Sequence, residues 1–404
     1  GDVYKRQVLC GMFLIPSVKA VGTAIEPESK DSLVHIAYTA ASNKDLAGGI
    51  SVLKPSEYLD KSYSTYALEG AEAFVGGSNL WGMGNALVLV DGVPRSIDNI
   101  TTSEIDQITF LKGANAVVLY GSRAANGVIL ITTKKGNSAG QRNINFSTGL
   151  TFEKAFSMPK MQNRYGVSDV VDSWGEKENL MAYDNLDDFF RTGLTSMTSV
   201  SISYGNENLQ TYFSYANTTG KGIIDKNKLR KHNINLRETA TMFDKRLKLD
   251  GSVNVMKQTV ENKPVSGGFY MNPLVGLYRF PRGEDLSYYK DHFETYDEER
   301  KLGVQNWHTF TEDFEQNPYW ITNRIQSKET RTRVILSLSA NFKVNDWLTI
   351  QARGNMDYWA DKLRQKFYAS TATALCGANG RYIEMDYQET LMYGDCLLYT
   401  SDAA

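Results

Sequence analysis

Long apolar stretches are missing from this sequence of 404 residues. Hydrophobic residues make up 42% of the chain, but no run of them approaches the roughly 20 apolar residues that a membrane-spanning helix requires. A surplus of one charge is missing too, because 44 Lys and Arg stand against 46 Asp and Glu. Such a balance gives the chain no excess of positive charge that would attract nucleic acid. These two absences exclude a helical membrane protein and argue against a nucleic-acid partner.

Cysteine and histidine are scarce. The three cysteines are Cys10, Cys376 and Cys396, and the long interval without any cysteine suits an exported protein without proving export. The four histidines are scattered, and no cysteine pair has a zinc pattern. No motif brings a nucleophile, a base and an orienting residue together. We therefore expect no enzyme activity, no metal site and no cofactor.

Residues 1–24 have the layout of a secretory signal peptide. Lys5 and Arg6 precede a short apolar stretch at residues 8–15, and small residues follow up to Ala24. A disordered tail is the alternative, because the apolar stretch is short and the chain does not start with Met.

Residues 41–140 mix strand and helix signals over short distances. Apolar runs that end at Gly or Pro are typical of buried strands, and acids after a Thr or Ser cap are typical of a short helix. We therefore expect a small α/β domain. Its strand signals lie at residues 86–91 (ALVLVD), 108–111 and 127–133 (GVILITT), and its helix signals lie at residues 101–107 and 114–120.

From residue 141 onward the pattern changes to a period of two. Along residues 143–152, Ile144 and Phe146 alternate with Asn145 and Ser147, so one face is apolar and the other is small and polar. About seven such strands, most near ten residues long, match strands that cross a bilayer at a tilt. The others lie near residues 200–204, 209–217, 231–240, 247–255, 334–342 and 348–358.

The connections between these strands differ in length. Short turns alternate with long loops, as periplasmic turns and extracellular loops do in outer-membrane barrels. A soluble β-sandwich also alternates apolar and polar residues, but very long loops are uncommon in it. We therefore favour a wall that faces lipid. The turns lie at residues 205–208, 241–245 and 343–346, and the loops at residues 153–198, 218–230 and 257–330.

About seven strands are too few for a barrel that encloses a folded domain, which needs about 22. An open sheet would leave strand edges unpaired in lipid, where no water satisfies them. We therefore expect part of a longer protein: a small α/β plug domain at residues 41–140, followed at residues 141–393 by part of a membrane β-barrel of about 22 antiparallel strands. Residues 394–404 and the first residues look like foreign sequence.

Four motifs follow one another in a fixed order within the α/β domain: VDGVP, LKG, LYGSRAANGVI and ITTKKG. In this order they resemble the plug-domain signature of the SusC/RagA class of TonB-linked outer-membrane receptors. The stretches at residues 267–283 and 317–320 also resemble this class. The signature residues are Val90, Asp91, Gly92, Val93, Pro94, Leu111, Lys112, Gly113, Tyr120, Gly121, Ser122, Arg123, Ala124, Ala125, Asn126, Gly127, Thr132, Thr133, Lys134 and Gly136.

Residues 33–38 (LVHIAY) lie within a segment at residues 25–40, where the class carries its TonB box. An extended segment can add as a strand to the edge of a periplasmic partner, which would let force act on the plug. An ordinary plug strand is the alternative. His35 and Thr39 depart from the acidic residue and the glycine that the class has there. The TonB-box-like residues are Leu33, Val34, His35, Ile36, Ala37 and Tyr38.

Aromatic side chains gather in and beside the loop at residues 257–330. Tyr270, Trp307 and Trp320 are candidates for stacking on a ligand such as a sugar ring. An interfacial girdle, or packing of the loop on itself, is the alternative that we favour.

The resemblance implies active import of a large nutrient, a glycan or a peptide, with the plug gating the lumen. It places the protein in the outer membrane of a Gram-negative, Bacteroidetes-like cell, with the plug on the periplasmic side. The implied partners are the TonB energy-transducing complex, a SusD-like surface lipoprotein that acts as a lid, and outer-membrane lipid. A non-transporting surface receptor or adhesin is the alternative, and it would need no engaged TonB box.

Overall fold

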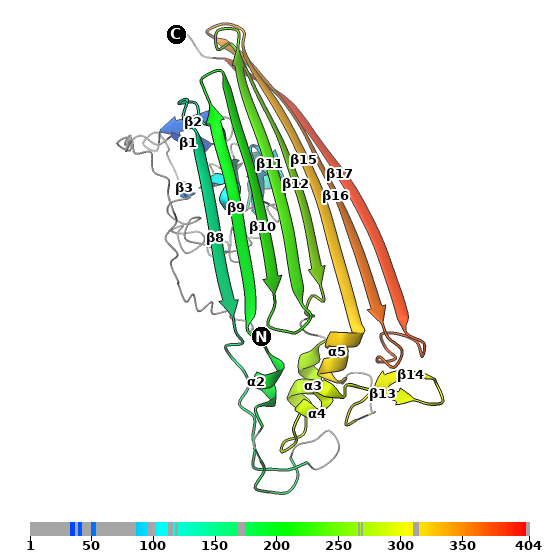
Figure 1. Ribbon diagram of the computed structural model, residues 1–404. Helices are drawn as coiled ribbons and strands as arrows, with labels where there is room; N and C mark the ends of the chain where they lie inside the picture. Colours follow the sequence, from blue (N-terminus) through cyan, green and yellow to red (C-terminus); the bar gives the residue numbers. More distant parts are fainter. Residues whose placement is uncertain are drawn as a thin grey trace.

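A computed structural model shows an eight-stranded wall, a five-stranded domain beside it, and a group of short helices and strands at one end of the wall (Figure 1). No described helix is long and apolar enough to cross a membrane. Residues 1–24 and the predicted site residues Ala37, Tyr38, Lys112 and Gly113 lie outside the described part of the chain. The described residues are 33–36, 39–42, 50–53, 86–95, 100, 102–111, 116–117, 120–167, 174–181, 183–265, 267, 270–309 and 315–400.

The five-stranded sheet belongs to the region predicted as the plug, and we call it the plug domain. Its central strand has apolar side chains on both faces, which explains its continuous VILI run. One core cluster contains Ile105, Ile108 and Ile131, and the other contains Leu89 and Leu130. The strand order is β3 (Ile50–Leu53), β6 (Ile105–Leu111), β7 (Val128–Thr133), β4 (Leu87–Val90) and β5 (Val93–Pro94), with only β4 and β7 parallel.

The predicted helix at residues 101–107 is wrong for its second half. A 3₁₀ turn, η3, covers Thr102–Glu104, and β6 begins at Ile105. Ile105 and Ile108 are fully buried in the core, so their burial in the sheet outweighs the helix signal of the acids. In the second predicted helix the described residues Ala116, Val117 and Tyr120 are helical, and the 3₁₀ helix η4 (Gly121–Ala124) follows.

Ahead of the plug sheet lies a separate hairpin. β1 (Leu33–Ile36) pairs antiparallel with β2 (Thr39–Ser42) in a sheet of two strands. The TonB-box-like segment is therefore extended over its described residues, and it is not a strand of the five-stranded sheet.

The wall contains all seven predicted strands and one more. β17 was not among the predicted strands, although Ile383 and Met385 alternate with Glu384 and Asp386 in its first half. The loop predicted at residues 218–230 is wrong at both ends, because polar residues extend the two flanking strands and leave only residues 222–227 between them. In order the antiparallel strands are β8 (Asn143–Glu153), β9 (Gly193–Gly205), β10 (Leu209–Lys221), β11 (Lys228–Met242), β12 (Leu247–Glu261), β15 (Ile325–Lys343), β16 (Leu348–Phe367) and β17 (Arg381–Thr400).

Short turns lie at one end of the wall, at the top in Figure 1, and the longer connections lie at the other end. The connection between β12 and β15 holds most of the short elements. In chain order these are α3 (Pro273–Arg279), α4 (Ser287–Asp291), β13 (Glu294–Asp297), β14 (Leu302–Gln305) and α5 (Pro318–Arg324). The helix α2 (Asn185–Phe189) lies in the connection between β8 and β9.

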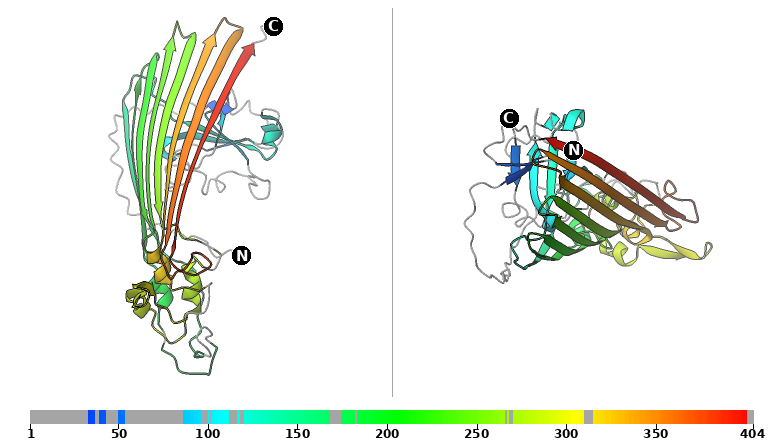
Figure 2. Two further views of the ribbon diagram at one scale, coloured as in Figure 1. Left: turned by 90° about the vertical axis from the view of Figure 1, so that its right-hand side faces the viewer. Right: turned by 90° about the horizontal axis from the view of Figure 1, so that it is seen from above.

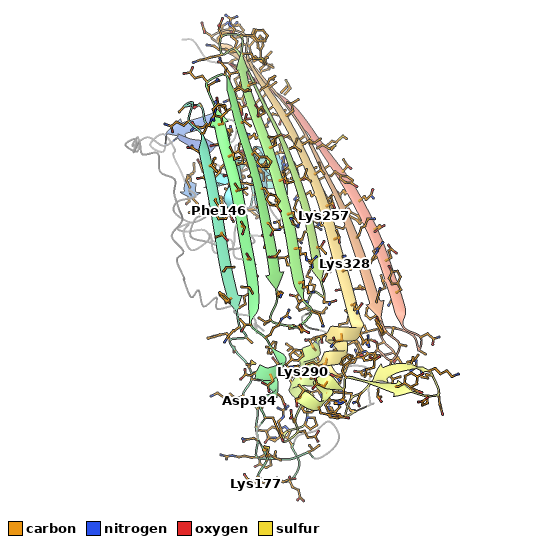
Figure 3. All side chains as sticks on the ribbon, viewed as in Figure 1. Phe146, Lys177, Asp184, Lys257, Lys290 and Lys328 are labelled. Atoms are coloured by element: carbon orange, nitrogen blue, oxygen red, sulfur yellow. The ribbon has the colours of Figure 1, made fainter. Side chains whose placement is uncertain are left out.

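The two faces of the wall have opposite character. One face, which we call the outer face, exposes large apolar side chains: Ile144 is 70% exposed, Phe146 65% and Leu338 61% (Figure 3 labels Phe146). The other, inner face buries polar side chains such as Asn233 and Arg237. A soluble β-sandwich would bury its apolar face, so this wall has the polarity of a membrane barrel.

Candidate functional site

The plug domain lies beside the wall (Figure 2), and it contacts the inner face through the turn between β4 and β5. Asp91 and Gly92 in this turn both have positive φ, at 49° and 81°. An Asp-Gly pair is suited to this two-residue hairpin turn. The turn directs the Asp91 carboxylate to the end of β7, where Oδ1 accepts a hydrogen bond from the Thr133 amide (3.0 Å) and Oδ2 from the Thr133 hydroxyl (2.6 Å).

Arg237 on β11 joins the plug domain to the wall. Its side chain is 7% exposed, and its Nη1 lies 3.2 Å from Asp91 Oδ2 and donates to Thr133 Oγ1 at 2.6 Å. On the wall side, its Nε donates to Asp250 Oδ1 (2.9 Å) and its Nη2 to Asp250 Oδ2 (3.2 Å). One guanidinium is thus shared between two carboxylates. We call Asp91, Thr133, Arg237 and Asp250 the arginine bridge.

The charge of Asp91 depends on this bridge. Burial raises the pKa of the Asp91 carboxyl, but the Arg237 guanidinium and the two hydrogen bonds from Thr133 act in the opposite direction and hold the pKa below its ordinary value. The ionised carboxylate is therefore the form that stabilises the contact.

Replacing Asp91 with Asn is expected to destabilise the plug domain in a pH-dependent way. A carboxyl with a lowered pKa contributes stability that is fully present above its ordinary pKa of 3.8 and is lost as the pH falls through the lowered value. Wild type should therefore be more stable than Asp91→Asn near neutral pH, and the difference should shrink on acidification below 3.8. Urea unfolding of the two full-length proteins across this range measures the difference. A gap that is independent of pH would contradict the prediction.

A second contact is made by Glu104, at the end of η3. This carboxylate is 1% exposed and accepts hydrogen bonds from three neighbouring wall strands. Its Oε1 accepts from Asn233 Nδ2 at 2.6 Å and from Ser214 Oγ at 3.3 Å, and its Oε2 accepts from Asn254 Nδ2 at 3.2 Å. These three partners are neutral donors. We call Glu104 and these three residues the carboxylate cradle.

The backbone of the segment that follows β7 also approaches the backbone of the wall closely. A Cβ atom on Gly136 would overlap the backbone of Gln210 and Thr211 on β10, so only glycine fits there. Arg95, which follows β5, donates to Ser337 Oγ at 3.5 Å.

Most signature residues shape the plug domain rather than its contact with the wall. Gly121 and Gly127 have positive φ, at 69° and 90°, and Arg123 is exposed. Of the signature, Asp91, Gly92, Thr133 and Gly136 meet the wall. The buried signature residues are Val90, Val93, Leu111 and Ala124, and the exposed ones are Gly121, Ser122, Arg123, Ala125 and Asn126.

The sequence did not reveal Glu104 or the wall residues as parts of a site. The sequence pattern predicts Glu104 only as an acid in the first turn of the helix expected at residues 101–107. The wall partners are ordinary inward-facing polar residues, and their only signal is their position in the strand alternation. Their pairing with the plug depends on register, which the sequence alone did not give.

The predicted aromatic ligand site is corrected for two of its three residues. Trp320 is 0% exposed and donates from Nε1 to Thr371 Oγ1 at 3.0 Å, and Trp307 is 5% exposed within an apolar cluster. Neither ring face is open to a ligand, because the loop packs on itself, which is the alternative that we favoured. Tyr270 is half-buried, and its role as a stacking residue stays a prediction.

Acidic, histidine and cysteine side chains do not gather into a possible metal site anywhere in the described ranges. The contact between the plug domain and the wall is instead polar, and ion pairs and hydrogen bonds join the small domain to the sheet.

Known proteins resemble both parts of the chain. The model of the TonB-dependent receptor plug domain family matches residues 42–128. TonB-dependent receptor SusC of Bacteroides thetaiotaomicron is 28% identical over an alignment of 275 residues, which covers 57% of this chain and 26% of that protein. TonB-dependent receptor P3 of Formosa agariphila is 26% identical over an alignment of 301 residues, which covers 66% of this chain and 29% of that protein. The chain thus spans less than a third of the length of these relatives.

The solved structure of the RagAB peptide importer in its open-open state has a similar fold. It superimposes with a TM-score of 0.62 at 17% identity, over 89% of this chain and 46% of that chain. The eight-stranded wall corresponds to part of a receptor barrel that is not closed within this chain.

Proposed function

We propose that this chain is the plug domain and part of the barrel of a TonB-dependent receptor of the SusC/RagA type, and that the full-length protein imports a large nutrient across the outer membrane. The nutrient is a glycan or a peptide. The named relatives are receptors and importers rather than enzymes, and one of them is described as a peptide importer. These relatives support import as the function, and an experiment has to decide between a glycan and a peptide as the nutrient.

The polar character of the contact between plug and wall carries this proposal. The arginine bridge and the carboxylate cradle hold the plug domain by hydrogen bonds and ion pairs. When such groups separate, water replaces their partners, so the net free-energy change for each hydrogen bond is only about 1 kcal/mol. An apolar contact would instead expose its surface to water. A plug held in this way can be displaced by a pull and can return.

Three further parts of the proposal concern partners and orientation. The segment at residues 33–38 engages the TonB energy-transducing complex by strand addition. The short turns of the wall lie on the same side as the plug domain, and short turns are periplasmic in outer-membrane barrels. The plug domain therefore faces the periplasm. A SusD-like surface lipoprotein covers the opposite end, where the short helices gather.

Proline substitutions in β1 test energy coupling. Proline has no backbone N–H and so blocks strand addition, whereas alanine keeps the donor. We expect Val34→Pro/Ile36→Pro in the full-length protein to abolish uptake of labelled oligosaccharides or oligopeptides, and Val34→Ala/Ile36→Ala to retain it. Binding of the same probes at the cell surface should be unchanged in both variants.

Uptake by the proline variant at the wild-type rate would contradict energy-coupled import. Wild-type cells that bind the probes and internalise none, with or without a proton gradient, would support a non-transporting receptor or adhesin instead. Equal amounts of each variant in the outer membrane exclude a loss through misfolding.

A further inference from the structure

The outer face of the wall changes character at one level across several strands. The cross-strand register places Ile234, Val255 and Val334 side by side in an apolar row. The next row toward the long connections contains His232 and Lys257. Rows between the apolar row and the short turns are mostly apolar. The apolar core of the bilayer therefore ends at this level.

Basic residues dominate the outer face beyond this level from β10 to β17, whereas β8 and β9 keep the exposed apolar residues Leu150, Phe152 and Leu194 there. Lys257 and Lys328 are exposed and, within the described part of the chain, form no ion pair (Figure 3). The few acids in this region are mostly paired, since Asp386 lies 3.5 Å from Lys362 and Glu384 lies 2.7 Å from Arg364. We call this region the basic belt. Its basic residues are Lys221, Lys228, Arg230, Lys257, Lys328, Lys362, Arg364 and Lys366, and its acids are Glu261, Glu384 and Asp386.

A shallow hollow of about 640 Å³ lies in the apolar part of the same face. Glycine leaves room at its floor: a Cβ atom on Gly354 would meet nothing within 4 Å, and one on Gly251 would meet only Leu338 and the Ser337 carbonyl at ordinary contact distances. We call it the outer hollow. Its outward-facing apolar lining consists of Leu236, Val253, Leu336, Leu338, Met356 and Met392.

We propose that the outer hollow and the basic belt together bind an anionic lipid of the outer membrane, with an acyl chain in the hollow and the phosphate group at the belt. Val253 in the hollow and Lys257 in the belt are four positions apart on β12, which is about 13 Å along a strand. This spacing lets one lipid molecule reach both regions.

The arrangement favours a lipid over a soluble anion or an acidic protein. The basic belt directly adjoins the apolar rows, so a headgroup at the belt has its acyl chains beside apolar side chains. Basic residues near an anionic membrane surface each contribute favourable binding energy. The inference depends on the wall facing lipid and is independent of whether the receptor imports anything.

Lipid competition in the purified full-length receptor tests the proposal. Phosphatidylglycerol and phosphatidylcholine with identical acyl chains are titrated separately, and native mass spectrometry counts the bound lipids. Wild type should prefer phosphatidylglycerol. Neutralising Lys257 and Lys328 to Gln should lower this preference about fivefold per lysine, the loss expected for one basic residue near the surface.

Two matched variants control for other effects. Lys177→Gln/Lys290→Gln neutralises two exposed lysines of the long connections, outside the belt (Figure 3), and should leave the preference unchanged. Gly354→Val fills the outer hollow and should weaken both lipids equally. A preference that survives in Lys257→Gln/Lys328→Gln, or that falls equally in Lys177→Gln/Lys290→Gln, overturns the proposal. Displacement of the bound lipid by inorganic phosphate at equal concentration overturns it too, because it would indicate a simple anion site.

Discussion

Replacing Arg237 with Leu is expected to destabilise the plug domain in the full-length receptor by about 3–5 kcal/mol, the cost of breaking a buried ion pair by removing one partner. The substitution leaves Asp91 and Asp250, which both contact the guanidinium now, facing each other without a cation. The Arg237 side chain that separates them is 7% exposed, and the Asp91 and Asp250 side chains are 24% and 13% exposed, so solvent compensates the lost charge only in part. Hydrogen exchange of the β4 and β7 amides in increasing urea measures the change.

Two further variants isolate the cause. Lys245→Leu removes an exposed partner of Glu207, where side chains are 69% and 71% exposed, and it should have no measurable effect. Adding Asp91→Asn and Asp250→Asn to Arg237→Leu removes the unbalanced charges and should restore much of the lost stability. If Arg237→Leu alone unfolds at the wild-type urea concentration, the arginine bridge does not hold the plug.

Replacing Trp320 with Ala is expected to destabilise the loop region by about 3–5 kcal/mol, the usual loss when a buried Trp is truncated. Trp320 is 0% exposed on α5, and its indole N–H donates to Thr371 in the connection between β16 and β17. The loss therefore separates two connections that are now packed together. Limited proteolysis between residues 262 and 324 should become faster, while the plug domain keeps its protection.

Trp174→Ala serves as the matched control. Its ring is 66% exposed and touches Tyr165 at a centroid distance of 5.8 Å, so little buried area is lost. Equal proteolysis of the Trp320→Ala protein and wild type would show that the loop cluster is held by other contacts.

The wall was largely predictable because a membrane strand has to alternate. Residues 143–152 showed this pattern in the sequence, and β8 covers Asn143–Glu153 in the structure. Prediction failed where strands leave the apolar layer: the outer ends of β10 and β11 carry mostly polar residues on both faces. In these parts hydrogen bonds between strands, rather than a hydrophobic face, maintain the sheet.

The site was predictable on one side only. Asp91 was found through the plug signature, but its partner Arg237 lies 146 positions along the chain. Several inward-facing polar residues on β11 satisfied the same alternation. The choice among them is made by the register of the strands and by the position of the β4–β5 turn, which are properties of the folded molecule.

The height at which the outer face loses its apolar side chains has a consequence for nutrient capture. β16 continues from Tyr358, in the last apolar row, to Phe367, a further rise of about 30 Å along the strand. For the import proposed above, this places the entrance of the lumen beyond the apolar layer of the wall, so a nutrient meets the rim before it reaches the lipid.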